Sequence, residues 1–162
     1  MLLSTAGRRL GEVIAGQLRD DPANEPILEE ALRALGRLQA GRRVAAADLS
    51  PALMPLLRPA VQGFLISGMA LDPADLIARV CLPILIVQGG RDLQITVADA
   101  ERLRAARPDA RLVLRPEANH VLKRVASSDR AANLAAYRDP ALPLDRGVAE
   151  AITRFILAEC PR

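Results

Sequence analysis

The clearest pattern of hydrophobic and polar positions lies between residues 83 and 120. Ile84-Leu85-Ile86-Val87 is an unbroken apolar run, which is typical of a parallel strand that is buried on both faces. Thr96 and Asp99 form a capping-box pattern at the start of a helix with one apolar face. Residues 111–114 are predicted to form a second strand. The pattern therefore predicts a strand–helix–strand unit in a parallel sheet.

The residues before this unit follow helical spacing. One amphipathic helix is predicted to begin near Leu10 and to end at Asp20-Asp21-Pro22. A second is predicted from about Pro26, and Gly41 is typical of the residue that ends a helix. Residues 50–79 carry four prolines, which indicates a run of short helices with sharp corners. We therefore expect this part of the chain to be all-helical.

These patterns divide the chain into three parts. Residues 1–7 are predicted to be the end of a core strand, residues 8–72 a helical region, and residues 73–162 an α/β segment. Within the last part, residues 124–143 are polar and irregular, and their length favours a functional or mobile loop. Asp145 is predicted to cap the final helix.

The composition narrows the classes of protein that the chain can represent. Its 162 residues suffice for one ordinary domain, and the fractions of hydrophobic (51%) and charged (25%) residues are typical of a globular protein. The formal net charge is +3, but the arginines are scattered and the aromatic content is only 2%. Nucleic-acid binding is disfavoured because it needs basic stripes and aromatic stacking platforms.

The cysteines and the hydropathy pattern indicate an intracellular location. Cys81 and Cys160 are far apart and lie in no CxxC motif, so neither a disulfide framework nor a zinc site is expected. No apolar run reaches the length of a membrane span, and no signal-peptide pattern is present. We therefore expect a cytoplasmic protein with no membrane partner, no metal and no cofactor.

Asp92 and His120 are the candidate catalytic residues. Asp92 follows the first predicted strand, and His120, the only histidine, follows the second. Because parallel strands end at the same sheet edge, the two side chains are expected to be neighbours. Taken singly, a loop histidine is more often structural, and an aspartate after a strand often only stabilises the turn. Their joint placement is that of the acid and base in a Ser–Asp–His triad, where the carboxylate orients an imidazole that carries the proton.

The segment from Leu82 to Lys123, LPILIVQGGRDLQITVADAERLRAARPDARLVLRPEANHVLK, resembles the α/β-hydrolase superfamily, of the esterase and serine-aminopeptidase-like kind. In this resemblance Asp92 matches the triad acid and His120 the triad histidine. It implies the carboxyl-terminal part of an α/β-hydrolase fold, with a small parallel sheet, flanking helices and residues 8–72 as a helical lid. The lid would line an apolar pocket for an ester- or amide-like small molecule through Leu53, Met54, Phe64, Leu65 and Met69.

The chain departs from the family at the nucleophile. The motif G-x-S-x-G is absent, and none of the five serines has glycines at both flanking positions. Ser4 follows an apolar stub but has no glycine elbow, so it is disfavoured as a substitute. The family's oxyanion-hole loop is missing as well. We therefore expect a fragment or truncated form that is inactive alone and is completed by an amino-terminal half.

An alternative of another class remains open. The chain is then a non-catalytic α/β interaction module that associates with itself. The apolar strand at residues 84–87 requires neighbours on both sides, and the chain offers few strands to pair with it.

Overall fold

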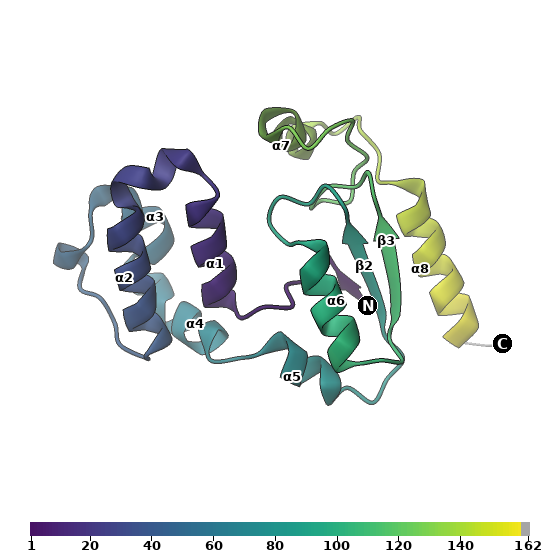
Figure 1. Cartoon of the computed structure of the whole chain (residues 1–162), viewed down its shortest axis with the longest axis horizontal. Helices are drawn as coiled ribbons and strands as arrows, with labels where there is room; N and C mark the ends of the chain where they lie inside the picture. Colours follow the sequence, from purple (N-terminus) through teal and green to yellow (C-terminus); the bar gives the residue numbers. More distant parts are fainter. Residues whose placement is uncertain (160–162) are drawn as a thin grey trace. The chain divides into compact units, whose positions relative to one another are not determined.

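A computed structural model of the chain describes residues 1–159, so Cys160 lies outside the described residues (Figure 1). The chain forms two compact units. One comprises Arg8–Pro73, and the other comprises Met1–Gly7 together with the chain from Ala74 onward. The sequence placed the corresponding boundaries after residues 7 and 72. We refer to Arg8–Pro73 as the helical unit and to the other as the sheet unit.

The sheet unit is built on a three-stranded parallel sheet in the order β1-β2-β3 (Figure 1). β2 (Leu85–Gly89) lies in the centre, with β1 (Leu2–Leu3) on one side and β3 (Arg111–Arg115) on the other. Ile86 pairs in register with Leu2 and with Leu112. The expected α/β class with a small parallel sheet is therefore confirmed.

Helices cover both faces of β2, because its apolar side chains alternate between them. Ile84 and Ile86 pack in one cluster with Leu103 of α6 (Val97–Ala106). Leu85 and Val87 pack in another with Phe155 of α8 (Arg146–Glu159). Every residue of β2 is buried, which confirms the prediction of a strand without a wet side.

Two predicted helix starts are present in the sheet unit. The capping box of Thr96 and Asp99 begins α6. Asp145 begins α8, where its Oδ1 accepts a hydrogen bond of 2.9 Å from the backbone N–H of Gly147. The same oxygen accepts one of 2.7 Å from Nε of Arg115, so the cap also ties α8 to the end of β3.

The polar segment at residues 124–143 is more ordered than its composition indicated. It contains α7 (Arg130–Arg138), so the prediction of an irregular loop is wrong for these residues. Asp129 caps this helix by accepting a hydrogen bond from the N–H of Ala132 at 2.8 Å. Asn133 and Ala136 of α7 are buried against the rest of the sheet unit. This packing stabilises a helix that the polar composition of the segment did not indicate.

The helical unit has a core of its own, centred on buried leucines such as Leu35, Leu38 and Leu57. Its second helix begins at Leu28 rather than Pro26 because the preceding residues form a 3₁₀ helix. Its elements are α1 (Leu10–Arg19), η1 (Pro22–Ile27), α2 (Leu28–Gln39), η2 (Ala46–Asp48), η3 (Pro51–Leu53), α3 (Met54–Leu57) and α4 (Pro59–Met69), followed by α5 (Pro73–Ala78) at the boundary.

Most of the residues expected to line a lid pocket occupy this core. Leu53, Leu65 and Met69 are buried in it, and Met54 packs against it. Phe64, by contrast, has 74% of its surface exposed. No helix among residues 1–159 combines the length and the apolar character needed to cross a membrane.

Gly41 ends α2 as the sequence predicted. Its φ of +74° lies in the left-handed region. Gly41 N–H donates to the carbonyl of Leu38 at 2.9 Å, and Arg42 N–H donates to that of Arg37 at 2.9 Å. These two bonds are those of a Schellman motif.

Replacement of Gly41 by alanine isolates the backbone preference, because an added Cβ has nothing within 4 Å. We expect Gly41→Ala to lower the free energy of unfolding by about 1 kcal/mol. Gly36→Ala, inside α2 and also free of contacts, is the matched control and should raise it by up to about 1 kcal/mol. Urea unfolding measures both, and equal effects of the two substitutions would contradict this explanation of the helix end.

Candidate functional site

Two loops meet at the carboxyl ends of β2 and β3. We call residues 90–95 the acid turn and residues 116–123 the histidine loop. A Cβ added at Gly89 would lie 2.4 Å from the carbonyl oxygen of Ala118, and one at Gly90 would lie 2.6 Å from that of Pro116. Neither glycine has a positive φ, so they are required for close backbone approach and not for a left-handed turn.

Backbone hydrogen bonds hold the two loops together at this point. Gly90 N–H donates to the carbonyl of Arg115 at 2.9 Å, and Arg91 N–H donates to that of Ala118 at 2.9 Å. Side chains at the tips of the two loops are therefore brought within contact distance, as the strand order predicted.

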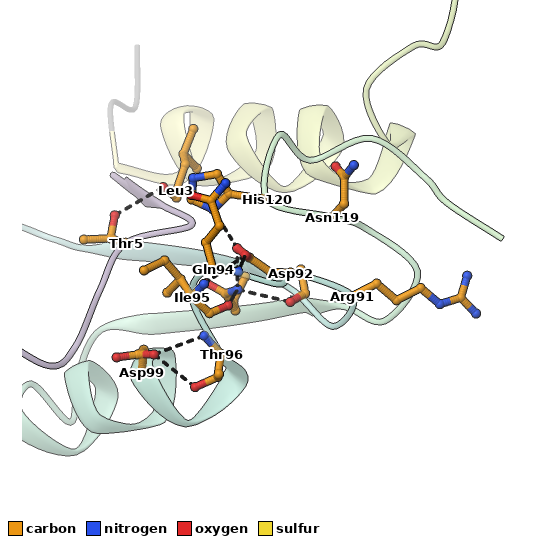
Figure 2. A network of polar contacts seen from close by, with 12 residues as sticks. Leu3, Thr5, Arg91, Asp92, Gln94, Ile95, Thr96, Asp99, Asn119 and His120 are labelled. Atoms are coloured by element: carbon orange, nitrogen blue, oxygen red, sulfur yellow. Dashed lines mark hydrogen bonds and ion pairs between the residues drawn. The ribbon is translucent and has the colours of Figure 1, made fainter. Parts of the chain in front are cut away.

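Asp92 and His120 are in direct contact (Figure 2). The distance from Asp92 Oδ2 to His120 Nδ1 is 3.0 Å. The Asp92 side chain has no exposed surface, whereas 28% of the His120 side chain is exposed. Because a carboxylate only accepts hydrogen bonds, Nδ1 carries the proton in this pair. In the neutral imidazole the lone pair then lies on Nε2.

The Asp92 carboxylate is held by donors on both of its oxygens. Oδ1 accepts from the backbone N–H groups of Gln94 at 2.8 Å and Ile95 at 2.9 Å. Oδ2 accepts from Nε2 of Gln88 at 3.1 Å in addition to His120. The acid turn thus wraps around the carboxylate and fixes its orientation.

These donors determine the charge of Asp92. Burial raises the pKa of its carboxyl group, but the hydrogen bond with His120, the backbone amides of Ile95 and Gln94 and the charge of His120 outweigh burial. The pKa of Asp92 consequently lies below its usual value. Asp92 is therefore an ionised acceptor at neutral pH.

The histidine loop closes on itself around Asn119, which is fully buried. Its backbone N–H donates to the carbonyl of Lys123 at 3.0 Å, and its Oδ1 accepts from Lys123 N–H at 3.0 Å. Leu122 has a φ of +59°, an uncommon conformation for a bulky residue, and its side chain is buried in the core under α8. Packing of Leu122 and closure at Asn119 together hold His120 in place.

A tyrosine and a glutamine lie close to the acid. The hydroxyl of Tyr137, from α7, lies 3.5 Å from Nε2 of Gln94. Burial raises the pKa of the Tyr137 hydroxyl, and the negative charge of Asp92 raises it further, while Gln94 and Arg130 act in the opposite direction. The net pKa is raised, so Tyr137 is a neutral hydroxyl group beside the pair.

Other polar contacts fasten α7 and the acid turn. Nδ2 of Asn133 donates to the carbonyl of Arg91 at 2.7 Å. The Arg91 guanidinium donates to the carbonyl of Val125, and its side chain extends away from Asp92 (Figure 2). Arg91 therefore contributes no direct partner to the carboxylate.

Among residues 1–159, the imidazole of His120 has one hydrogen bond, the one with Asp92. None of the five serine hydroxyls in residues 1–159 hydrogen-bonds to the imidazole. Ser4 follows β1 with a φ of +45°, but its Oγ is buried and has no hydrogen-bond partner among these residues. Within residues 1–159, no group of three or more His, Cys, Asp or Glu side chains is placed to hold a metal ion.

Sequence reasoning missed two polar neighbours of the pair. Gln88 continues the apolar run of β2, and its polarity in a buried strand is a signal that could have been used. Tyr137 is the only tyrosine of the chain, but it lies in the segment expected to be irregular. Nothing in the local pattern indicates that it approaches Asp92.

Comparison with known proteins adds no relative. A scan against family models, a search of curated proteins and a search of solved structures each found no match to this chain.

The close approach of the two loops can be tested by a single methyl group. We expect Gly89→Ala to destabilise the chain by roughly 1–3 kcal/mol, because the added Cβ meets the backbone of Ala118. It should also separate His120 from Asp92 and change the NMR signal of the single imidazole. Gly16→Ala, whose Cβ would make only an ordinary contact at 3.6 Å, is the control. An unchanged imidazole signal in Gly89→Ala would contradict the importance of this contact.

The lowered pKa of Asp92 predicts how stability depends on pH. The folded state binds fewer protons than the unfolded state between the folded pKa and the reference value of 3.8. The contribution of Asp92 is therefore complete above 3.8 and is lost as the pH falls through the folded pKa. We expect Asp92→Asn to reduce the loss of stability between about pH 6 and about pH 3 in urea unfolding. An equal loss in both proteins would show that the carboxylate is not stabilised as described.

Proposed function

We propose that Asp92 and His120 are the acid and base of a Ser–His–Asp hydrolase that cleaves an ester- or amide-type bond. The observation that carries this proposal is the 3.0 Å contact between Oδ2 of the buried, ionised Asp92 and Nδ1 of the partly exposed His120. This contact leaves Nε2 of the imidazole as the basic atom, which is the requirement for taking a proton from a hydroxyl nucleophile.

In this proposal each residue has a defined role. His120 takes the proton of a serine hydroxyl through Nε2 as the oxygen attacks the substrate carbonyl, and then donates it to the leaving group. Asp92 orients the imidazole and stabilises its protonated form. The serine and the donors that stabilise the oxyanion are supplied by a polypeptide segment outside this sequence.

The placement of the pair supports this assignment. The acid follows β2 and the histidine follows the adjacent parallel strand β3, at the sheet edge where open α/β folds bind ligands. The helical unit, which interrupts the sheet unit between β1 and α5, is proposed to be the lid of the enzyme. In residues 1–159 one edge of β1 has no strand paired to it, and further strands are proposed to complete the sheet there.

A second candidate function is self-association of a non-catalytic module. The observation that favours it is the apolar edge at β1, where Leu3 is 40% exposed and Met1 57% exposed. In the described residues β1 pairs only with β2, so its other edge is available to a second copy. On this hypothesis substitution of Asp92 and His120 leaves the role of the protein unchanged.

The experiment that tests the hydrolase begins with the coding DNA upstream of Met1. We expect an in-frame or adjacent segment with a strand, a G-x-S-x-G turn and a helix. Produced together with this chain, that segment should hydrolyse p-nitrophenyl esters. His120→Ala and Asp92→Asn should each lower kcat/KM by roughly 10³- to 10⁴-fold. Asp109→Asn is the control and should retain activity, because Asp109 is exposed and precedes the amino-terminal end of β3, opposite to the end that carries the histidine loop.

Two results would overturn the proposal. One is the absence of any such segment together with no ester hydrolysis by the purified chain. The other is a complex whose hydrolysis is unaffected by His120→Ala. A concentration-dependent dimer without esterase activity would favour the second candidate.

A further inference from the structure

Gln88 is a fully buried polar side chain in the central, otherwise apolar strand β2. Its Nε2 faces three oxygen atoms: Ile95 O at 2.8 Å, Gly89 O at 3.1 Å and Asp92 Oδ2 at 3.1 Å. Its Oε1 is buried and has no hydrogen-bond partner among residues 1–159. The amide therefore satisfies its donors and leaves its acceptor unsatisfied.

This orientation is determined by the surroundings of the amide. Rotation by 180° would place Oε1 against two carbonyl oxygens and a carboxylate, all of which are acceptors. A buried carbonyl without a donor is unfavourable, yet the alternative is worse because it adds repulsion from the charge of Asp92. The amide is thus locked with its N–H groups toward the acid.

An ionised carboxylate has about four acceptor directions. In Asp92, two are filled by the backbone N–H groups of Gln94 and Ile95 on Oδ1. Oδ2 accepts from His120 Nδ1 and from Gln88 Nε2. The four donors leave no acceptor direction at which the carboxyl group could hold a proton without displacing one of them.

We propose that Gln88 is a positioning residue of the Asp92–His120 pair. Its N–H group occupies the acceptor direction of Oδ2 that His120 leaves open. This hydrogen bond also weakens the attraction between the carboxylate charge and the imidazole. In this way Gln88 keeps Asp92 an acceptor toward Nδ1 and limits how strongly the carboxylate holds the proton of His120. The catalytic meaning of this role rests on the proposed hydrolase function, but the coupling itself does not.

The other charged and titratable groups around the acid do not duplicate this contact. The negative charge of Asp92 raises the pKa of the Tyr137 hydroxyl on α7, and the charge of Arg130 lowers it, whereas Asp92 takes no hydrogen bond from either side chain. The Arg91 guanidinium bonds to the carbonyl of Val125. Among residues 1–159, Gln88 and His120 are the two side chains that donate hydrogen bonds to the Asp92 carboxylate.

The single histidine makes a direct test practical. The imidazole of the full chain, labelled with ¹⁵N, is titrated by NMR in the unaltered protein and in Gln88→Met, which keeps the side-chain length and removes the donor. With only His120 left as a side-chain donor, Asp92 should hold the imidazole proton more tightly. We expect the proton-binding constant of His120 to rise by about threefold, with Nδ1 still protonated in the neutral form.

Gln94→Met is the matched control. The Gln94 side chain bonds to the Tyr137 hydroxyl, and its contact with Asp92 is made by the backbone, which the substitution retains. It should leave the titration of His120 unchanged. Equal titrations of His120 in Gln88→Met and the unaltered chain, or an equal change in both variants, would overturn the proposal.

A second measurement needs no substitution and covers the case in which Gln88→Met does not fold. In the unaltered chain the side-chain amide signals of Gln88 should shift with the titration of His120, because both groups share Oδ2. Amide signals that show no inflection would overturn the proposal. Both experiments are made without substrate. A failure to hydrolyse esters would therefore contradict the hydrolase function and would not affect the measured coupling between Gln88 and His120.

Discussion

The contact between two stretches of backbone is the constraint on which the site depends. Gly89 and Gly90 lie against Pro116 and Ala118 at distances that admit no side chain. Parallel pairing of β2 and β3 brings the two loops to one edge of the sheet. The lack of a Cβ atom at Gly89 and Gly90 then allows the two backbones to touch. The 3.0 Å distance between Asp92 and His120 follows from this approach.

The site also balances the burial of a charge against the donors that surround it. A carboxylate removed from water is strongly unfavourable unless hydrogen bonds replace the lost hydration. Asp92 receives two from its own turn, one from the histidine loop and one from Gln88 within β2. The central strand therefore has two roles. Its apolar side chains pack against the helices, and its one polar side chain, that of Gln88, donates a hydrogen bond to the acid.

Features that depend on local periodicity and helix capping could be predicted from the sequence. Features that depend on tertiary contacts mostly could not. Residues 84–87 predicted the buried strand, and Thr96 with Asp99 predicted the start of α6, because these signals are local. The meeting of Asp92 and His120 was also predictable, because parallel strands end at one edge.

The remainder of the site required the three-dimensional arrangement. Tyr137 approaches the acid only after α7 has packed, so its position along the chain carries no signal. Gln88 is four residues from Asp92, and its polarity in the apolar run is a signal, but the run does not show that the amide turns toward the acid. α7 itself was missed because its burial depends on contacts made by Asn133 and Ala136. The proposed lid residues show the same limit, since helical spacing does not distinguish Leu53, Leu65 and Met69 in a core from side chains around a pocket.

The discontinuity of the sheet unit has a consequence for the order in which it folds. β2, α6 and β3 are consecutive in the chain, whereas β1 is separated from β2 by the whole of the helical unit. The pairing of Leu2 with Ile86 and the bond from Ser4 N–H to the carbonyl of Val87 therefore close a long loop for few contacts. Local contacts form first in such an arrangement. We therefore expect the strand–helix–strand unit to form first, and β1 to add to a sheet whose acid and histidine loops have already met.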